Sequence, residues 1–472
     1  MNIQAYEDKY HNKAKFVDNW MEGIKFLPFT SNPSTAFDKK CSLHGIVGEY
    51  FRLWEGGSTQ PLDGDNKQLE EKLESFLKAK GMRESEIELF CKVVRDVLFV
   101  DGNLNFTDSA FLKFLPYLPF NNSLESNEQK KYMSGEMKMA HYLYSMRDRE
   151  LAYPTKNTDN NLFINVLRES FKSNGFLASY SNSENYYVLP FIKASFASDF
   201  KWLMEQEEIV KCKYIGLFFY FYACYSVVQS VLSIKNNRNE KKMDSPVPIY
   251  FMLASEKASR SHDAVQRGGQ KCFPKGSLEH LFGEVQAIDI ANSLLGGNIG
   301  LYPELMAEFN KVSFEENKAK CEYILQNLKD DKIEMFSHRN SESADGYQEI
   351  DLCVESYVDF LKKLRHICVG MQSPSYNSRI KKKVTDLLGV RFLKKRREYQ
   401  VLALDNEMLL FLIAMITRNE KTKLEDMYKK LLSYGICLNR GTRLLIEDYL
   451  LDLNLLDRKS DSGEAQYVKV VL

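Results

Sequence analysis

The sequence has no excess of either charge, little glycine or proline, and no paired cysteine motif. Its 472 residues contain 64 Lys and Arg against 64 Asp and Glu, so the formal net charge is zero. The low content of Gly (24) and Pro (12) excludes collagen-like and low-complexity chains. A hydrophobic fraction of 44% excludes a wholly disordered chain. The charge balance argues against a uniformly basic nucleic-acid coat, although local basic patches stay possible. The length predicts about two to four domains.

The nine cysteines are scattered and none forms a CxxC pair. Most lie in apolar or helical surroundings, which predicts reduced, buried thiols rather than a disulfide framework. The first residues, MNIQAYEDKYHNK, carry both charges and do not resemble a secretory signal. We therefore expect a cytoplasmic protein.

One stretch is long and apolar enough to raise the question of a membrane. Residues 214–234, YIGLFFYFYACYSVVQSVLSI, contain no charged side chain, and a transmembrane helix needs about 20 mainly apolar residues. Four tyrosines are spread along the stretch, whereas tyrosines of membrane helices favour the two interfaces. This pattern favours a helix buried on all sides in a core over a membrane span.

No motif for catalysis or for a cofactor is present. The sequence has no GxxxxGK[ST] phosphate loop, no HExxH zinc motif and no GxSxG nucleophile elbow. Glu136 and Lys138 match the E-x-K fragment of metal-dependent nucleases, but the same residues suit an ordinary helix face. His262 and Asp263 are adjacent, so on a helix they point to different sides. We expect a chain without catalytic residues, metal or cofactor, and a nuclease site without a recognisable motif stays open as an alternative.

The fold class that the sequence predicts is mainly α-helical. Leucines four residues apart predict a helix over 67–80, which ends at Gly81 and forms a hairpin with a second helix over 85–98. Residues 129–147, 161–172 and 314–329 also have helical patterns, and residues 248–253 (PIYFML) suit a short strand. We expect residues 1–360 to form a helical body, with a possible subdivision near the polar loop 235–246.

Charge is strongly segregated along the chain. Residues 361–400 hold 12 Lys and Arg but only two acids, for a net charge of +10, whereas residues 1–360 carry −9 and residues 401–472 carry −1. We define residues 361–404 as the basic segment. Its clustered cations are Lys381, Lys382, Lys383, Lys394, Lys395, Arg396 and Arg397. Such clusters can neutralise DNA phosphates and release counterions. The alternative is a solvated face that pairs with the acidic body.

Residues 405–472 predict three helices followed by a β-hairpin, the element order of a winged helix-turn-helix. Asp405 suits the N-cap of an apolar helix over 408–416, and Thr422 with Glu425 has the spacing of a capping box for the second helix. Gly435 suits the C′ position of that helix, and Asn439 can cap the third. Two short strands then flank a turn at 461–463.

Two functions are open for this domain. In a DNA-reading version the third helix enters the major groove and the wing touches the backbone. The cations in position for this are Arg440, Arg443, Arg458 and Lys459. Winged helices also dock proteins, and the domain's net charge of −1 is unfavourable for a DNA reader that works alone.

The C-terminal sequence resembles a known family. The runs RFLKKRREYQVLALDNEMLLFLIAMIT and LEDMYKKLLSYGICLNRGTRLLIEDYLLDLNLL, and above all KSDSGEAQYV at 459–468, are similar to the end of the DptG (DndG) family. Glu464 stands where that ending has Asp, and Tyr434-Gly435 stands where the family tends to have an arginine–glycine turn. The similarity covers about 80 residues, and PIYFMLASEKASRSHDAVQRGG is more loosely similar.

The resemblance implies a cytoplasmic subunit of a bacterial system that restricts DNA lacking phosphorothioate modification. The expected partners are DNA and the DptF-like and DptH-like subunits, which would supply ATPase activity. We expect a non-catalytic subunit that engages DNA and serves as a scaffold. The alternatives are a pure docking subunit without DNA contact and a cryptic nuclease in the body.

Overall fold

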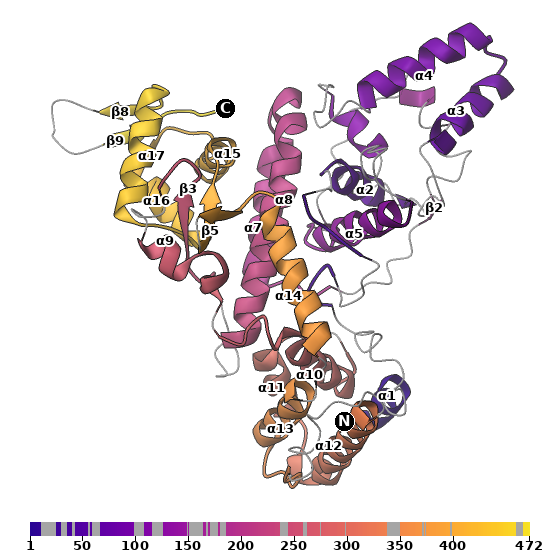
Figure 1. Ribbon diagram of the computed structural model, residues 1–472, viewed down its shortest axis with the longest axis vertical. Helices are drawn as coiled ribbons and strands as arrows, with labels where there is room; N and C mark the ends of the chain where they lie inside the picture. Colours follow the sequence, from indigo (N-terminus) through magenta and orange to yellow (C-terminus); the bar gives the residue numbers. More distant parts are fainter. Residues whose placement is uncertain are drawn as a thin grey trace.

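The computed structural model describes most of the chain and shows a mainly α-helical protein with a few short strands, which confirms the predicted fold class at this level. The molecule is elongated, with the N-terminus near its lower end and the C-terminus in the upper part (Figure 1). The residues described are 1–10, 25–29, 35–39, 43–54, 57–58, 67–98, 108–115, 126–148, 150, 164–166, 169, 178–179, 186–236, 244–257, 262–273, 275–297, 299–337, 350–370, 372, 374–396, 399–458 and 466–472.

A long helix, α8 (Glu208–Asn236), runs through the middle of the molecule (Figure 1). It contains the uncharged run 214–234, and 94% of its most apolar stretch of 18 residues is buried inside the protein. Its hydroxyl groups find partners on neighbouring elements: Tyr220 donates to the carbonyl of Leu387 at 3.1 Å, and Tyr222 donates to Asp199 at 2.5 Å. The apolar run is therefore a core helix in this structure, as the spread of its tyrosines predicts.

The upper body packs helices from the first half of the chain around α8. They are α2 (His44–Trp54), α5 (Ser126–Tyr144) and α7 (Pro190–Met204). The 3₁₀ helix η2 (Ser109–Phe114) packs against α2 and α8. Tyr50 lies at the centre of their aromatic core, with ring centroids 4.5 Å from Phe219 and 5.5 Å from Phe200. Aromatic residues bury large apolar areas, so this cluster stabilises the body.

The predicted hairpin is confirmed. Helices α3 (Lys67–Ala79) and α4 (Glu84–Leu98) pack against each other and extend away from the rest of the molecule (Figure 1). The helix predicted over 129–147 corresponds to α5, whereas most of the predicted helix 161–172 lies outside the described residues. Two-residue strands β1 (Gly57–Ser58) and β2 (Ala178–Ser179) pair antiparallel.

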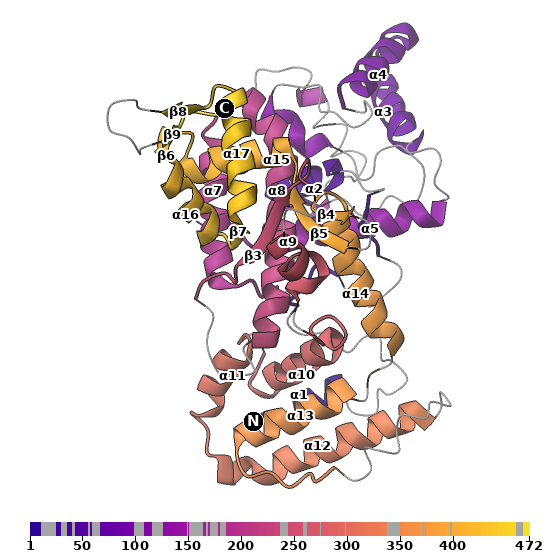
Figure 2. The same ribbon diagram turned by 60° about the vertical axis from the view of Figure 1, so that its left-hand side comes forward.

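A second bundle forms the lower end of the molecule (Figure 2). Its central helix is α10 (Leu281–Leu294), which is buried along its whole length. A Cβ atom at Gly283 would lie 2.5 Å from the carbonyl oxygen of Cys368, so glycine permits the close approach of α10 to α13. The other helices are α1 (Ile3–Lys9), α11 (Tyr302–Phe309), α12 (Phe314–Ser337) and α13 (Tyr357–Gly370).

Strands from distant parts of the sequence form a four-stranded sheet in the order β4-β5-β3-β7. The strand predicted over 248–253 is confirmed as β3 (Ile249–Leu253). It pairs in parallel with β5 (Tyr399–Leu404) on one side and β7 (Ile436–Leu438) on the other. β4 (Leu393–Arg396) pairs antiparallel with β5. Next to the sheet lie α9 (His262–Arg267) and the 3₁₀ helix η5 (Gly269–Cys272). Thus a strand within the first 360 residues holds together strands of the last 80.

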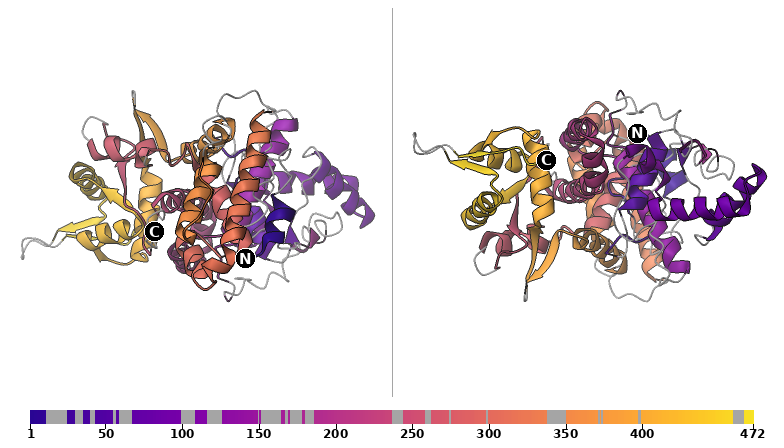
Figure 3. Two further views of the ribbon diagram at one scale, coloured as in Figure 1. Left: turned by 90° about the horizontal axis from the view of Figure 1, so that it is seen from below. Right: turned by 90° about the horizontal axis from the view of Figure 1, so that it is seen from above.

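The last residues form three helices and a small antiparallel sheet on the side opposite the N-terminal helices (Figure 3). The elements in chain order are α15 (Asn406–Thr417), β6 (Thr422–Lys423), α16 (Leu424–Ser433), β7, α17 (Arg440–Asp452), β8 (Leu456–Arg458) and β9 (Gln466–Val468). β9 lies between β6 and β8 and pairs antiparallel with both. The predicted turn at 461–463 lies outside the described residues.

Most of the predicted helix ends are confirmed, and one is wrong. Asp405 accepts a hydrogen bond from the Met408 amide at 2.9 Å, and Asn439 accepts one from the Thr442 amide at 2.8 Å. Gly435 has a φ of +74°, which suits a C′ glycine. The capping box of Thr422 does not form, because Thr422 pairs with β9 as part of β6. Lys423 is the N-cap of α16 and makes no side-chain capping bond.

Candidate nucleic-acid interface

The middle of the basic segment forms helix α14 (Pro374–Gly389), whose apolar side faces the core. Tyr376, Ile380, Val384 and Leu387 recur every three or four residues on that side and are all buried. Successive residues of an α-helix point about 100° apart, since 3.6 residues complete a turn. The three lysines at 381–383 therefore point in different directions instead of forming one patch.

Lys381 points into a cavity of about 920 Å³. Its Nζ lies 2.8 Å from Glu279, and this ion pair lowers the pKa of that carboxyl below its usual value. The residues that line the cavity come from α8, α13, α14 and the loop before α10: Lys235, Lys275, Gly276, Glu279, His280, Arg365, His366, Val369, Gly370, Gln372, Asn377, Ser378 and Lys381. Cations outnumber acids in this set, so the cavity favours an anion.

Lys382 and Lys383 point away from the cavity. Lys382 is exposed and pairs with Asp386 one turn later. Lys383 is largely buried and donates a hydrogen bond to Thr35 Oγ1 at 2.9 Å. The pKa of Lys383 is lowered to about 8, first by burial and then by the neighbouring charges of Lys138, Lys131 and Arg379. We call Lys131, Lys138, Arg379 and Lys383 the basic cluster.

Strand β4 spreads the second predicted set of cations over two faces, because alternate residues of a strand point to opposite sides. Lys394 is half-buried and its charge helps to lower the pKa of Asp405, whereas Lys395 is exposed. Arg396 lies at the end of the strand, and Arg397 falls outside the described residues. Only part of this set is therefore placed by the structure.

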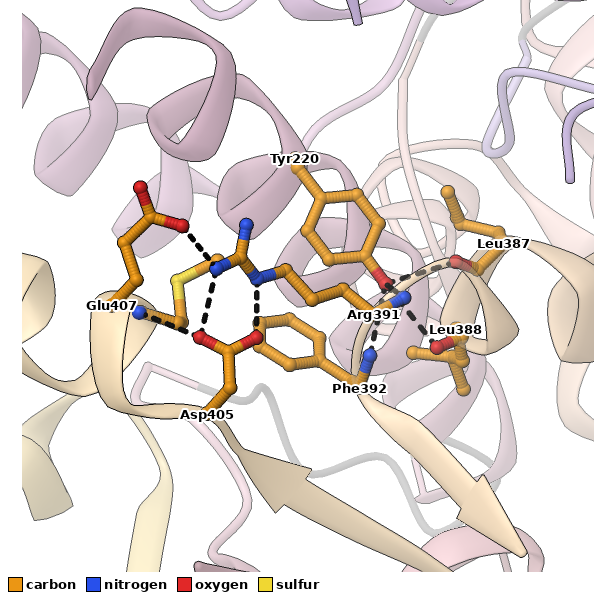
Figure 4. Close-up of polar contacts among 8 residues, drawn as sticks. Tyr220, Leu387, Leu388, Arg391, Phe392, Asp405 and Glu407 are labelled. Carbon is orange, nitrogen blue, oxygen red and sulfur yellow. Dashed lines mark hydrogen bonds and ion pairs between the residues drawn. The ribbon is translucent and has the colours of Figure 1, made fainter. Parts of the chain in front are cut away.

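A polar junction ties α14 and β4 to the C-terminal helices (Figure 4). Tyr220 Oη accepts hydrogen bonds from the amides of Arg391 at 2.9 Å and Phe392 at 3.2 Å. The Arg391 guanidinium pairs with Asp405 at 2.5 Å and with Glu407 at 2.6 Å. Burial opposes ionisation of Asp405, but hydrogen bonds from Arg391 and the Met408 amide keep its pKa below the usual value. This junction fixes the orientation of the basic segment relative to α8 and α15.

The cations of α17 have different surroundings. Arg440 is exposed at the start of the helix. The Arg443 guanidinium stacks over the ring of Tyr428 at 4.7 Å, so it is held against α16. Between them, Thr442 is fully buried and donates to Glu256 at 3.0 Å. One side of the first turn of α17 is thus occupied by the segment after β3. Arg458 ends β8, and Lys459 lies outside the described residues.

The candidate catalytic residues do not come together in a site. Glu136 is fully buried on α5, and Lys138, two positions further on, belongs to the basic cluster. His262 is exposed at the start of α9, and Asp263 pairs with Arg267 at 3.8 Å. Among the residues that the structure describes, no group of three or more His, Cys, Asp or Glu could hold a metal ion.

Six of the cations around α14 could not be found from sequence: Lys131, Lys138, Lys235, Lys275, Arg365 and Arg379. With the exception of Arg365 and Arg379 they lie outside the basic segment, in stretches of mixed charge. Folding alone brings them to the two sides of α14.

No protein-family model matches the sequence, and no match to a curated protein is found.

Proposed function

We propose that this protein is a non-catalytic, DNA-engaging and scaffolding subunit of a bacterial restriction complex that acts on DNA lacking phosphorothioate modification. The resemblance of its C-terminal sequence to the DptG family suggests the complex, its cytoplasmic location and its ATPase partners. The surroundings of α14 suggest the nucleic-acid contact. The chain would bind the phosphate backbone, and the DptF-like and DptH-like subunits would carry out the ATP-dependent work.

The observation that carries the DNA contact is the basic cluster on α14 and α5. Lys131, Lys138 and Arg379 all lower the pKa of Lys383, whereas Asp386 raises it, so cations outnumber acids around this lysine. An arrangement of this kind favours a polyanion, because each phosphate neutralises a cation and releases counterions. Lys382 on α14 and Lys395 on β4 are exposed and could add further phosphate contacts outside this cluster.

We further propose that residues 405–472 form a winged helix. The order α15-β6-α16-β7-α17-β8-β9, with β9 between β6 and β8, supports this fold. Arg440, exposed at the start of α17, is then in position to touch DNA, and Arg458 ends β8, the strand that would lead into the wing. Lys459, the last of the predicted contacts, lies outside the described residues.

A second function, docking of a partner protein, is favoured for this same domain by one observation. The first turn of α17 is packed through Thr442 against Glu256, and Arg443 is held on Tyr428. A recognition helix needs its first turn accessible to base edges. The occupied face of α17 therefore supports a winged helix that binds a partner ATPase, while α14 supplies the DNA contact.

Alanine substitution of the two predicted clusters tests the DNA role. One variant changes Lys381, Lys382 and Lys383, and a second changes Lys394, Lys395, Arg396 and Arg397. Backbone contacts carry no sequence information, so we expect both variants to weaken binding to two unrelated duplexes by similar factors. A matched control removes exposed lysines outside the basic segment, at Lys92 and Lys311, and should keep full affinity. Unchanged affinity in the cluster variants would exclude the basic segment as the DNA contact.

A pull-down separates the docking role from the DNA role. The full chain should retain the partner ATPases, and an Arg440→Glu substitution on the exposed start of α17 should reduce retention if this surface docks a protein. If DNA binding falls instead and partner retention is unchanged, the winged helix contacts DNA.

A further inference from the structure

The cavity beside α14 collects cations from four separate parts of the fold. Lys235 comes from the end of α8, Lys275 from the loop before α10, Arg365 from α13 and Lys381 from α14. His280 and His366 lie on the same walls, and Glu279 is the one acidic residue among those lining the cavity. Convergence of this kind concentrates positive potential in a concave space.

Arg365 is held in place by a carboxylate outside the cavity. Its Nε lies 2.7 Å from Glu284, whose side chain is only 2% exposed. Its terminal nitrogens make no hydrogen bond to any residue that the structure describes. A guanidinium fixed through Nε presents these terminal groups in a fork that matches phosphate oxygens.

Gly276 leaves room at the cavity wall for two further side chains. It has a φ of +81°, and a Cβ atom there would lie 2.8 Å from the His280 ring and 3.6 Å from Lys235 Nζ. Any other residue would be strained and would crowd these side chains.

The size and lining of the cavity define the class of ligand. A volume of about 920 Å³ is within the usual range for small-molecule sites, about 300–1,000 Å³. The side chains that line the cavity are mostly polar or charged, with Val369 the one aliphatic residue, and the rings among them are the imidazoles of His280 and His366. The cavity therefore suits a ligand recognised by its charge, with several oxygens on one centre.

We propose that this cavity binds a phosphate monoester or polyphosphate group, as presented by a free nucleotide or by the 5′ end of a nucleic-acid strand. Lys275, Arg365 and Lys381 contact the phosphate oxygens. Glu279 competes with the ligand, because it already occupies Lys381 at 2.8 Å. The site is separate from the DNA surface of the proposed function, which binds internal phosphodiesters.

Calorimetric titration of the full chain with pyrophosphate tests the site. Lys275→Gln, at an exposed position, and Lys381→Gln, at a partly exposed one, should each weaken binding about tenfold, since each removes one charge-assisted contact. Glu279→Gln should tighten binding, because it removes the competitor for Lys381. Lys362→Gln is the matched control, because this exposed residue shares α13 with Arg365 but does not line the cavity, and it should leave the affinity unchanged.

Four ligands then identify the source of the phosphate. ATP is compared with adenosine, and a 5′-phosphorylated oligonucleotide with the same strand ending in a 5′-hydroxyl. Tighter binding of ATP assigns a free nucleotide, and tighter binding of the phosphorylated strand assigns a strand end. Equal binding within both pairs, no binding of pyrophosphate, or weaker binding in Glu279→Gln would overturn the proposal. Covalently closed circular duplex has no terminal phosphate, so its binding reports on the DNA surface alone.

Discussion

Lys332 on α12 allows a quantitative test of how burial in the interior behind the cavity changes a lysine pKa and, through it, the stability of the protein. Its side chain is fully buried, and burial lowers the pKa of its ammonium to about 8. The Nζ donates to Gln286 Oε1 at 2.8 Å, and this oxygen also accepts from Gln372 Nε2 at 2.7 Å. Lys332→Met keeps a similar shape and leaves Gln286 with one donor, so the substitution removes the charge without leaving the acceptor unpaired.

The expected effect depends on pH in a defined direction. The unfolded chain holds the Lys332 proton up to its ordinary pKa of about 10.4, whereas the folded chain releases it near pH 8. Between these values the unfolded state binds more protons, so this group makes the wild-type protein more stable as the pH rises. From pH 7 to pH 9.5 the gain is about 2 kcal/mol. The stability of Lys332→Met relative to wild type should therefore fall by about 2 kcal/mol over the same interval.

Urea denaturation followed by circular dichroism at the two pH values measures this difference. Groups that titrate in this range and do not interact with Lys332 are common to both proteins and cancel in the comparison. Lys362→Met, at an exposed position on α13, is the control and should change stability by less than about 0.5 kcal/mol at either pH. A stability difference between Lys332→Met and wild type that does not vary with pH would refute the reasoning.

Two further substitutions test how the C-terminal helices are attached. Asp199 is fully buried and accepts from Tyr222 at 2.5 Å and Tyr434 at 2.7 Å, with Arg418 at 2.7 Å. Asp199→Ala should lower the free energy of unfolding by about 3 kcal/mol in urea titrations, since it leaves buried donors without an acceptor. A loss below about 1 kcal/mol would contradict the assigned network. Arg391→Met should cost about 1 kcal/mol by the same assay, because Arg391 joins β4 to Asp405 through a partly exposed ion pair. An unchanged stability would show that this pair contributes nothing to the junction.

The parts of the fold that could be predicted depend on residues close together in the sequence. Asp405 and Asn439 each cap an amide three positions later, and Gly435 supplies its own positive φ. The leucines of α3 repeat over a single helix. In each case the partners lie within a turn or two, so the pattern alone is sufficient.

Predictions from the sequence were wrong or incomplete where a residue interacts with another that is distant in the sequence. Thr422 has the right spacing for a capping box, but pairing with Val468 takes it into a strand. The three consecutive lysines read as one cluster in the sequence, yet on a helix they face a cavity, the solvent and the body. The cavity itself needs Lys235 and Lys275, which have no sequence relation to α14. Tertiary structure decides these cases.

The dependence of DNA affinity on salt concentration tests the central claim most directly. The variant to compare with wild type carries four Gln substitutions, at Lys131, Lys138, Arg379 and Lys382. Each lost phosphate contact should lower the slope of log affinity against log salt concentration by about 0.9. Covalently closed duplex DNA as the ligand excludes any contribution from terminal phosphates. Our account predicts that the slope for the variant is smaller by about 3.6. An identical slope in the two proteins would contradict the placing of DNA at α14.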